Sequence, residues 1–183
     1  IEAALIAHKL GSSTAIVTMD PIAFGRMSCN PAIGGLAKGQ IVREIDMLGG
    51  IMAKVTDTCA LQIKTLNKKK GRAVWSPRAQ TDKREYEKQI KNIIKKSNID
   101  IIIGEAVSIS IKNNKIRSFR LRDERTVYCK CGIITAGTFL SGVVHVGERK
   151  ILAGRMGEER SEGLTDSLVA CGFKSGRLKT GTP

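Results

Sequence analysis

Apolar residues recur along the chain with two different spacings, which separate predicted helices from predicted strands. Residues 1–11 are rich in alanine, leucine and isoleucine and end in a glycine, a pattern that predicts a helix. The apolar run 15–19 stops at Asp20-Pro21 and predicts a buried strand. A helix that leads directly into a buried strand is typical of the second half of a β-α-β unit. We therefore expect the first strand of that unit, with its connecting loop, to precede Ile1.

Two amphipathic helices are predicted in the next part of the chain. Residues 20–80 are rich in glycine and loops, but residues 39–49 place apolar side chains on one helical face and end at a glycine. A second helix is predicted from Thr81 or Asp82, either of which is a suitable cap, to about Lys96. The apolar stripe of the first helix consists of Ile41, Val42, Ile45 and Leu48. The apolar stripe of the second helix consists of Tyr86, Ile90, Ile93 and Ile94.

After the second helix the spacing changes to that of strands. Residues 99–103 are largely apolar and predict a strand covered on both faces. Residues 106–131 alternate apolar with polar positions, with turns at 113–114 and 123–125, and predict a three-stranded antiparallel meander. Residues 132–138 predict a further buried strand that ends in a turn of small residues. The chain therefore predicts an α/β fold, an incomplete Rossmann-type domain of parallel sheet and helices with an inserted antiparallel β-meander.

Composition and charge add an expectation about partners. Of the 183 residues, 42% are hydrophobic and 26% are charged, which is typical of globular proteins. The 31 lysines and arginines exceed the 17 aspartates and glutamates, and the net charge of +14 favours a polyanion such as RNA or DNA. Aromatic residues make up only 4%, which argues against an open platform for base stacking. The apolar runs are too short to span a membrane and no secretory signal is visible, so we expect a cytosolic protein.

One cysteine is distinguished by its surroundings. Cys29 lies in a loop bounded by Asn30-Pro31 and Gly34-Gly35, so we do not expect it inside a helix or strand. Arg26 and Lys38 supply positive charge nearby, and such surroundings lower the pKa of a thiol and raise its thiolate content. A reactive thiol, acting as nucleophile or acid–base group, is one interpretation. A small residue buried in a tight loop is the other.

The remaining candidate sites carry less information. Cys129 and Cys131 are two residues apart, which places both on one face of a strand and is not the spacing of zinc sites. His8 and His145 are the only histidines and lie far apart, so we expect no metal site. A basic cluster at residues 64–72 is a better candidate for phosphate contact than the dispersed lysines elsewhere. The candidate RNA contacts are Lys68, Lys69, Lys70, Arg72, Arg78 and Lys179.

Several motifs occur in the order that one family shows. Ser28-Cys29-Asn30-Pro31-Ala32-Ile33-Gly34-Gly35 opens the series, and Ala136-Gly137-Thr138-Phe139-Leu140 and Gly176-Arg177-Leu178-Lys179-Thr180-Gly181-Thr182-Pro183 follow later. The sequence resembles the FAD-dependent subunit of the tRNA uridine 5-carboxymethylaminomethyl modification enzyme, the MnmG (GidA) family. The resemblance runs through all 183 residues and covers less than a third of the family's full chain.

The resemblance implies an activity, cofactors and partners. The family binds FAD in a Rossmann-type domain, is reduced by NADH and takes a one-carbon unit from methylene-tetrahydrofolate. With the GTPase partner MnmE, in a heterotetramer, it adds a carboxymethylaminomethyl-type group to carbon five of the wobble uridine of tRNA. The family is homodimeric and works in the cytoplasm or an organellar matrix. The resemblance also makes Cys29 a catalytic residue.

The resemblance further assigns residues and boundaries. Residues 1–183 correspond to a partial FAD-binding domain, and residues 139–183 begin the inserted substrate and NAD-side region. The implied FAD contacts are Val107, Ser161, Ala136, Gly137, Thr138, Asn30, Gly34 and Gly35. We expect the family's glycine-rich phosphate loop before Ile1, so that this chain alone holds FAD poorly and is inactive.

Two other functions remain as alternatives. The strongly basic chain suits an RNA-binding module without catalysis, whose binding weakens steeply with salt. A different flavoprotein of the same architecture, such as a disulfide reductase, is disfavoured because the chain has no Cys-x-x-Cys motif.

Overall fold

The computed structural model of the protein describes residues 1–27 and 30–180, which form two compact units. The first unit contains residues 1–16 and 20–102, and the second contains residues 17–19 and those from 103 onward.

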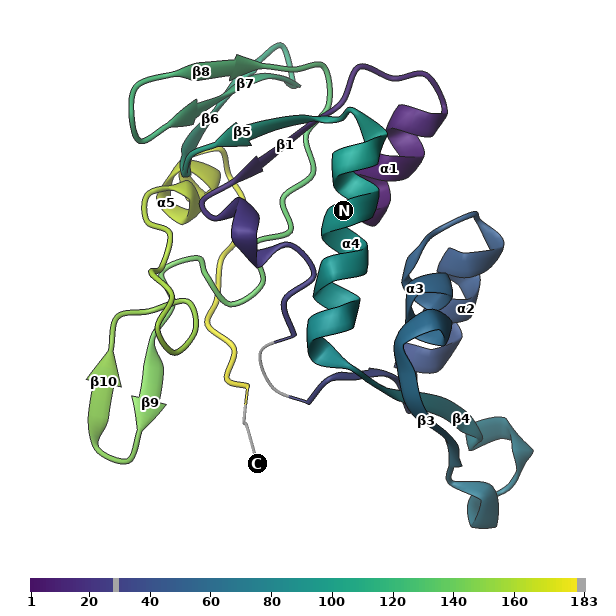
Figure 1. Cartoon of the computed structure of the whole chain (residues 1–183). Helices are drawn as coiled ribbons and strands as arrows, with labels where there is room; N and C mark the ends of the chain where they lie inside the picture. The colour runs from purple at the N-terminus through teal and green to yellow at the C-terminus, as the bar shows by residue number, and fades with distance from the viewer. Residues whose placement is uncertain (28–29, 181–183) are drawn as a thin grey trace. The chain divides into compact units, whose positions relative to one another are not determined.

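The chain passes from one unit to the other within two paired strands (Figure 1). These strands, β1 (Ala15–Thr18) and β5 (Asp100–Ile103), form a two-stranded parallel sheet. Strands predicted at 15–19 and 99–103 are therefore confirmed. The α/β class is confirmed as well, as a partial Rossmann-like arrangement with separate antiparallel sheets.

The first unit contains four α-helices among its described residues. They are α1 (Glu2–Lys9), α2 (Lys38–Met47), α3 (Met52–Cys59) and α4 (Lys83–Ser97). The first, second and fourth confirm predicted helices, whereas α3 falls within a segment that was expected to be loop. Its start depends on a partner distant in the sequence, as described below, which a local pattern does not reveal.

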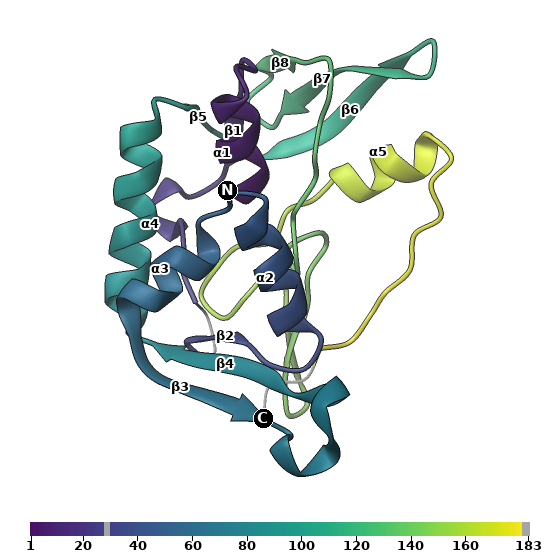
Figure 2. The ribbon, with the colours of Figure 1, turned by 90° about the vertical axis from the view of Figure 1, so that its right-hand side faces the viewer.

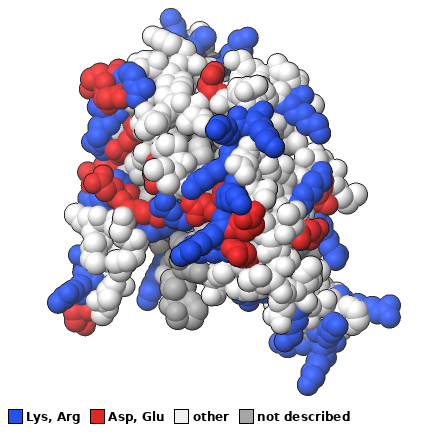
Figure 3. Space-filling view, in the orientation of Figure 1, with Lys and Arg blue, Asp and Glu red and all other residues white. Residues whose placement is uncertain are grey.

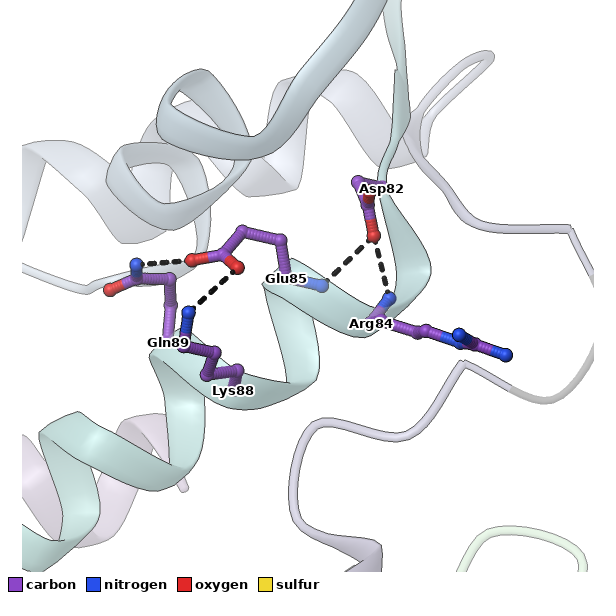
Figure 4. A network of polar contacts seen from close by, with 5 residues as sticks. All are labelled: Asp82, Arg84, Glu85, Lys88 and Gln89. Atoms are coloured by element: carbon purple, nitrogen blue, oxygen red, sulfur yellow. Dashed lines mark hydrogen bonds and ion pairs between the residues drawn. The ribbon is translucent and has the colours of Figure 1, made fainter.

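Helix α4 forms as its sequence predicts (Figure 4). The Asp82 carboxylate accepts hydrogen bonds from the N–H groups of Arg84 and Glu85, each at 2.9 Å, so Asp82 is the cap. The Glu85 carboxylate accepts hydrogen bonds from the Lys88 ammonium at 3.2 Å and the Gln89 amide at 2.7 Å. Asn98, in a left-handed conformation, ends the helix.

The buried face of α4 meets α3 to form the core of the first unit. The buried members of this core are Val55, Cys59, Tyr86, Ile90 and Ile94. Side chains from the loop before β2 and from the start of α3 pack around them. A side chain at position 25 has no room, since a Cβ on Gly25 would lie 2.8 Å from the Cβ of Ile90. Tight packing of this kind holds residues 24–27 against the core.

An antiparallel sheet lies beside these helices. Its strands are β2 (Ala32–Gly34), β4 (Ser76–Thr81) and β3 (Ala60–Leu66), in that spatial order. Figure 2 shows α2 and α3 on the same side of this sheet. The expectation of a loop-rich stretch up to residue 80 is therefore wrong for residues 60–66 and 76–80. Leu61 and Ile63 are 71% and 64% exposed, so β3 lacks the buried alternation by which strands are recognised.

Two predicted buried faces are also corrected. Ile41 on α2 and Leu48, the residue that ends it, are exposed, whereas the buried residue of α2 is Gly39, which lies against Pro77 of β4. On β5, Ile101 and Ile103 are 41% and 55% exposed, so this strand is not covered on both faces. A two-stranded sheet offers too little surface to bury both sides of a strand.

The second unit begins with the predicted meander. Strands β6 (Ala106–Lys112), β7 (Lys115–Leu121) and β8 (Thr126–Tyr128) pair in sequence order, with Asn113 and Asn114 both at positive φ in the first turn. This confirms the meander, although its last strand ends three residues before the predicted limit of 131. Beyond it lie the hairpin of β9 (Val144–Val146) and β10 (Arg149–Ile151) and the short helix α5 (Leu164–Ala170).

The buried strand predicted at 132–138 is wrong. These residues have no strand conformation, and Ile133 is 71% exposed. No strand in the described part of the chain pairs with them. An apolar run becomes a strand only where a neighbour satisfies its backbone groups.

A carboxylate distant in the sequence begins α3. Glu2 of α1 accepts hydrogen bonds from the N–H of Ile51 at 3.0 Å and from that of Met52 at 2.6 Å. No side chain of α3 itself caps this end. Gly50 leaves room for the carboxylate, since a Cβ there would lie 2.9 Å from a Glu2 oxygen. Glu2 therefore joins α1 to α3 by a charge-assisted cap.

Removing this cap should destabilise the first unit. Glu2→Ala is expected to lower the free energy of unfolding by about 1–2 kcal/mol, because two helix N–H groups lose their acceptor. Glu2→Gln keeps one acceptor oxygen and should cost less. Urea unfolding measures both, with Glu148→Ala, at an exposed carboxylate, as the control. Equal effects of Glu2→Ala and the control would contradict the role of Glu2.

Candidate functional site

The candidate reactive residue Cys29 lies outside the described residues, and the segments on either side of it are held by β4. Thr81, 1% exposed, donates its backbone N–H to the Pro31 carbonyl at 2.7 Å. Its hydroxyl lies 3.0 Å from the same carbonyl and 3.5 Å from the sulfur of Met27. Thr81 thus contacts residues on both sides of Cys29. The sequence suggested Thr81 only as a helix cap, and its role as an anchor depends on a residue 50 positions away.

The glycines after Cys29 have a packing role that the structure explains. A Cβ on Gly34 would lie 2.3 Å from the Pro77 carbonyl oxygen, and Gly34 has a φ of +96°. Gly35 donates its N–H to that oxygen at 2.8 Å. Glycine is therefore required at position 34 for β2 to approach β4 closely. Packing against β4 alone accounts for the glycine at position 34. Asn30, just before β2, is exposed.

The positive charges expected near Cys29 differ in their environment. Arg26 forms an ion pair with Asp20 at 3.5 Å, so part of its positive charge is compensated. Lys38 is the first residue of α2 and is exposed. Of these two charges, Lys38 is the one in an exposed position, at the start of a helix whose N-terminus carries partial positive charge.

In the second unit, Val107 occupies an irregular position of β6. Ala106 pairs with Leu121 and Ser108 pairs with Arg120, so Val107 is the extra residue of a β-bulge. In the described register Val107 has no paired residue on β7. Gly163 lies against it, since a Cβ on Gly163 would be 3.1 Å from the Val107 carbonyl oxygen.

Hydrogen bonds around Glu105 and Phe139 hold the segment that contains Ser161. The Ser161 carbonyl accepts a hydrogen bond from the Ser141 N–H at 2.8 Å, and the Ser161 N–H donates to the Phe139 carbonyl at 2.9 Å. Glu105 accepts two hydrogen bonds from the Arg122 guanidinium and one from the Glu162 N–H at 2.8 Å. The 7% exposed Ser161 thus lies between a carboxylate and the turn at 139–141.

The network changes the acidity of Glu105. The hydrogen bonds from Arg122 hold the pKa of the Glu105 carboxyl below its ordinary value. Burial opposes this effect, while the N–H of Glu162 and the hydroxyl of Ser161 also lower the pKa. Sequence reasoning missed Glu105, whose only local indication is an acidic residue immediately before a predicted strand.

The turn of small residues lies beside Ser161. Gly137 has a φ of +57° and open space where a side chain would be, and Ala136 is half-buried. The Thr138 hydroxyl donates to the Gly154 carbonyl at 2.8 Å. Leu140 and Ser161 form an isolated parallel bridge. The structure therefore brings Val107, Ser161 and the turn 136–138 together in one unit.

These residues fit a cofactor contact. Val107 is the unpaired residue of the bulge, the open side of Gly137 offers space, and Ser161 is next to Glu162, whose N–H donates to Glu105. A ligand such as FAD needs backbone groups and small residues of this kind along its length. Asn30, Gly34 and Gly35 belong to the first unit.

The candidate RNA contacts are also divided between the units. Figure 3 shows Lys and Arg side chains gathered over the end of the β3–β4 hairpin, at the lower right. This end contains Lys68, Lys69, Lys70 and Arg72, all exposed, while Arg78 is half-buried on β4 opposite Gly34 and Lys64. Lys179 is exposed in the second unit.

The other cysteines have ordinary surroundings. Cys129 and Cys131 follow β8 rather than lying on it, which corrects their expected place on a strand. Burial raises the pKa of the Cys129 thiol and that of Cys59, which lies in the core.

Within residues 1–27 and 30–180, no three His, Cys, Asp or Glu side chains gather as a metal site needs. No helix in that part of the chain is long and apolar enough to cross a membrane.

Comparison with known proteins gives a consistent result. A family model described as glucose inhibited division protein A matches residues 1–183. The tRNA uridine 5-carboxymethylaminomethyl modification enzyme MnmG of Flavobacterium johnsoniae is 45% identical over 183 residues, which are 100% of this chain and 29% of that protein. The MnmG of Aquifex aeolicus is 47% identical over 184 residues, which cover 100% of this chain and 30% of that protein.

A solved structure agrees with these matches. The crystal structure of Aquifex aeolicus GidA has a TM-score of 0.88 and 45% identity to this chain, and the match covers 94% of this chain and 29% of that chain. The chain thus spans less than a third of the length of the relatives that it matches.

The anchor at Thr81 can be tested by removing its hydroxyl. Thr81→Val keeps the backbone bond to Pro31 and the volume, but leaves the carbonyl with one donor fewer. We expect the free energy of unfolding to fall by about 1 kcal/mol, measured by urea unfolding. Thr126→Val, at an exposed strand position, is the control and should have little effect. Similar losses in both variants would contradict the anchor.

The Glu105 network should make stability depend on pH. Because the pKa of Glu105 is lowered on folding, its carboxylate stabilises the fold above the unfolded-state pKa of about 4.3, and this is lost as pH falls through the folded pKa. Glu105→Gln should cost about 1 kcal/mol at neutral pH, a modest value because solvent screens the largely exposed Arg122.

Denaturant unfolding of wild type and variant across acidic pH measures this difference, which should shrink below about pH 4. Glu124→Gln, at an exposed carboxylate, is the matched control. A difference that stays constant with pH would show that the charge of Glu105 is not what stabilises the network.

Proposed function

The chain belongs to the glucose inhibited division protein A family, and from this membership we propose that it is part of a FAD-dependent enzyme that modifies the wobble uridine of tRNA. The modification is the addition of a carboxymethylaminomethyl-type group to carbon five of the uracil ring. The observation that carries the proposal is the match along all 183 residues, together with the names of relatives at 45% and 47% identity.

The proposal assigns FAD to the second unit. Bound FAD would supply the redox chemistry of the reaction. Val107, the extra residue of the β6 bulge, and the buried Ser161 would hold and orient the cofactor together with Ala136, Gly137 and Thr138. Asn30, Gly34 and Gly35 would contact it from the first unit.

Cys29 is the proposed catalytic residue. Support comes from Thr81, which contacts Met27 and Pro31, residues on either side of Cys29 in the sequence. Lys38 and the start of α2 follow Cys29 closely in the sequence, and a cation or a helix N-terminus favours the thiolate form of a thiol beside it. Cys29 would then act on the uracil ring as nucleophile or proton donor.

The remaining reactants and partners follow the same proposal. NADH would reduce the flavin, and methylene-tetrahydrofolate would donate the one-carbon unit. The GTPase partner MnmE would join a homodimer of the full-length protein in a heterotetramer, in the cytoplasm or an organellar matrix. The tRNA would be contacted by the basic end of the β3–β4 hairpin, by Arg78 and by Lys179.

A basic module that binds RNA without catalysis is the second candidate. The net charge of +14 and the exposed lysines of the hairpin favour it. Both candidates predict RNA binding that weakens with salt, but only the enzyme requires Cys29.

Replacing the thiol distinguishes these functions. In the holoenzyme that contains this chain, Cys29→Ser is expected to keep bound flavin, seen by its absorbance, and to lower wobble-uridine modification by about a hundredfold or more. Mass spectrometry of nucleosides from the tRNA measures the modification. Cys171→Ser, at an exposed cysteine, is the matched control and should remain active. Normal modification by Cys29→Ser would remove this thiol from the reaction.

A further inference from the structure

The end of the β3–β4 hairpin is a surface of unbalanced positive charge. Between Ala60 and Thr81 the sequence has six lysines and arginines and no aspartate or glutamate: Lys64, Lys68, Lys69, Lys70, Arg72 and Arg78. We call residues 67–75 the hairpin tip. Lys68–Lys70 and Arg72–Val74 form short 3-10 turns that hold the exposed ammonium groups together. Without neighbouring carboxylates, this charge remains available to an anionic ligand.

The only tryptophan of the sequence lies in this tip. The Trp75 indole N–H donates to the Lys68 carbonyl at 3.2 Å, and the Trp75 backbone N–H donates to the Arg72 carbonyl, also at 3.2 Å. The Asn67 amide donates to the Val74 carbonyl at 3.4 Å and so closes the tip. The ring is therefore fixed in orientation although 40% of the residue is exposed.

Arg72 completes the arrangement. Its guanidinium carbon lies 5.9 Å from the centroid of the Trp75 ring, within the range of a cation–π contact. The planar guanidinium thus lies over the Trp75 ring, and three lysines are close to both in the sequence. This combination of an aromatic plane with adjacent cations is the arrangement by which proteins bind single-stranded nucleic acid.

We propose that Trp75, supported by Arg72, stacks an unpaired base of an RNA loop while Lys68, Lys69 and Lys70 contact the phosphates beside it. The inference rests on the proposed function, because it specifies how the tRNA would be bound. The low aromatic content argues against an extended stacking platform, but one base needs only one ring. A base paired within a duplex has no face available, so the tip selects loops over helices.

The charge and ring would also suit an anionic membrane surface. RNA is favoured because the indole N–H is used within the protein and the ring is locked beside a guanidinium. A membrane anchor would instead need an apolar side chain that can enter the lipid. The apolar groups of the tip other than Trp75 are short, namely Ala73 and the half-buried Val74.

Fluorescence of Trp75 tests the contact directly. The 183-residue chain is titrated with an RNA stem-loop whose loop carries unpaired uridines, with the matching duplex that lacks the loop, and with phosphatidylserine vesicles. The stem-loop is expected to quench the emission, and the duplex to bind by charge with little quenching. Equal quenching by stem-loop and duplex, or a response to vesicles alone, would overturn the proposal.

Variants separate stacking from charge. By anisotropy of labelled RNA, Trp75→Leu should weaken stem-loop binding about fivefold to a hundredfold and leave duplex binding unchanged. Trp75→Phe, which keeps a ring, should fall between. Lys69→Gln should weaken both ligands and lower the salt slope of stem-loop binding by about 0.7. Lys115→Gln, at an exposed turn of the second unit, is the control.

The outcomes also separate this inference from the proposed function. If Trp75→Leu and Trp75→Phe bind the stem-loop as wild type does, stacking is wrong, whatever Cys29→Ser shows. If both weaken it while Cys29→Ser retains modification, the RNA contact stands and the catalytic assignment of Cys29 falls.

Discussion

The first unit depends on two consecutive residues, Thr81 and Asp82, where β4 passes into α4. Thr81 donates its N–H and directs its hydroxyl to the Pro31 carbonyl, which fixes the start of β2. Asp82 donates its N–H to the Cys59 carbonyl at 2.8 Å, at the end of α3, and caps α4 with its side chain. Four elements therefore meet at one junction beside the buried core. A disturbance there would move the segment before β2 together with both helices.

Features fixed by neighbouring residues could be predicted from the sequence. Helix α4 has its cap, its apolar stripe and its terminating asparagine within one continuous stretch, and all of these are observed. The β6–β7 hairpin likewise depends on Asn113-Asn114, whose positive φ angles suit a tight turn. Strand β3 was missed and a strand at 132–138 was wrongly predicted for a common reason. Pairing with another strand decides whether a segment becomes a strand, and the pattern of a single segment does not reveal it.

The cofactor contacts at the candidate site stay predictions, and the residues that support this site were not predicted from the sequence. Val107 and Ser161 were assigned by resemblance, and the structure places them in one unit. Glu105 and Thr81 were missed, because their partners Glu162 and Pro31 lie 57 and 50 positions away. The hairpin tip was likewise predicted only in part from the sequence. Its lysines were recognised as a cluster, whereas the alignment of Arg72 with Trp75 depends on the turn between them.

The proposed function assigns the reactive thiol to Cys29 of the first unit and FAD contacts to Val107 and Ser161 of the second. A crystal structure of the holoenzyme with FAD bound tests this most directly. The account predicts that the cofactor contacts Val107 and the Ser161 hydroxyl, and that the Cys29 sulfur faces the isoalloxazine ring. A cofactor bound away from these residues, or a sulfur enclosed by aliphatic side chains, would contradict it.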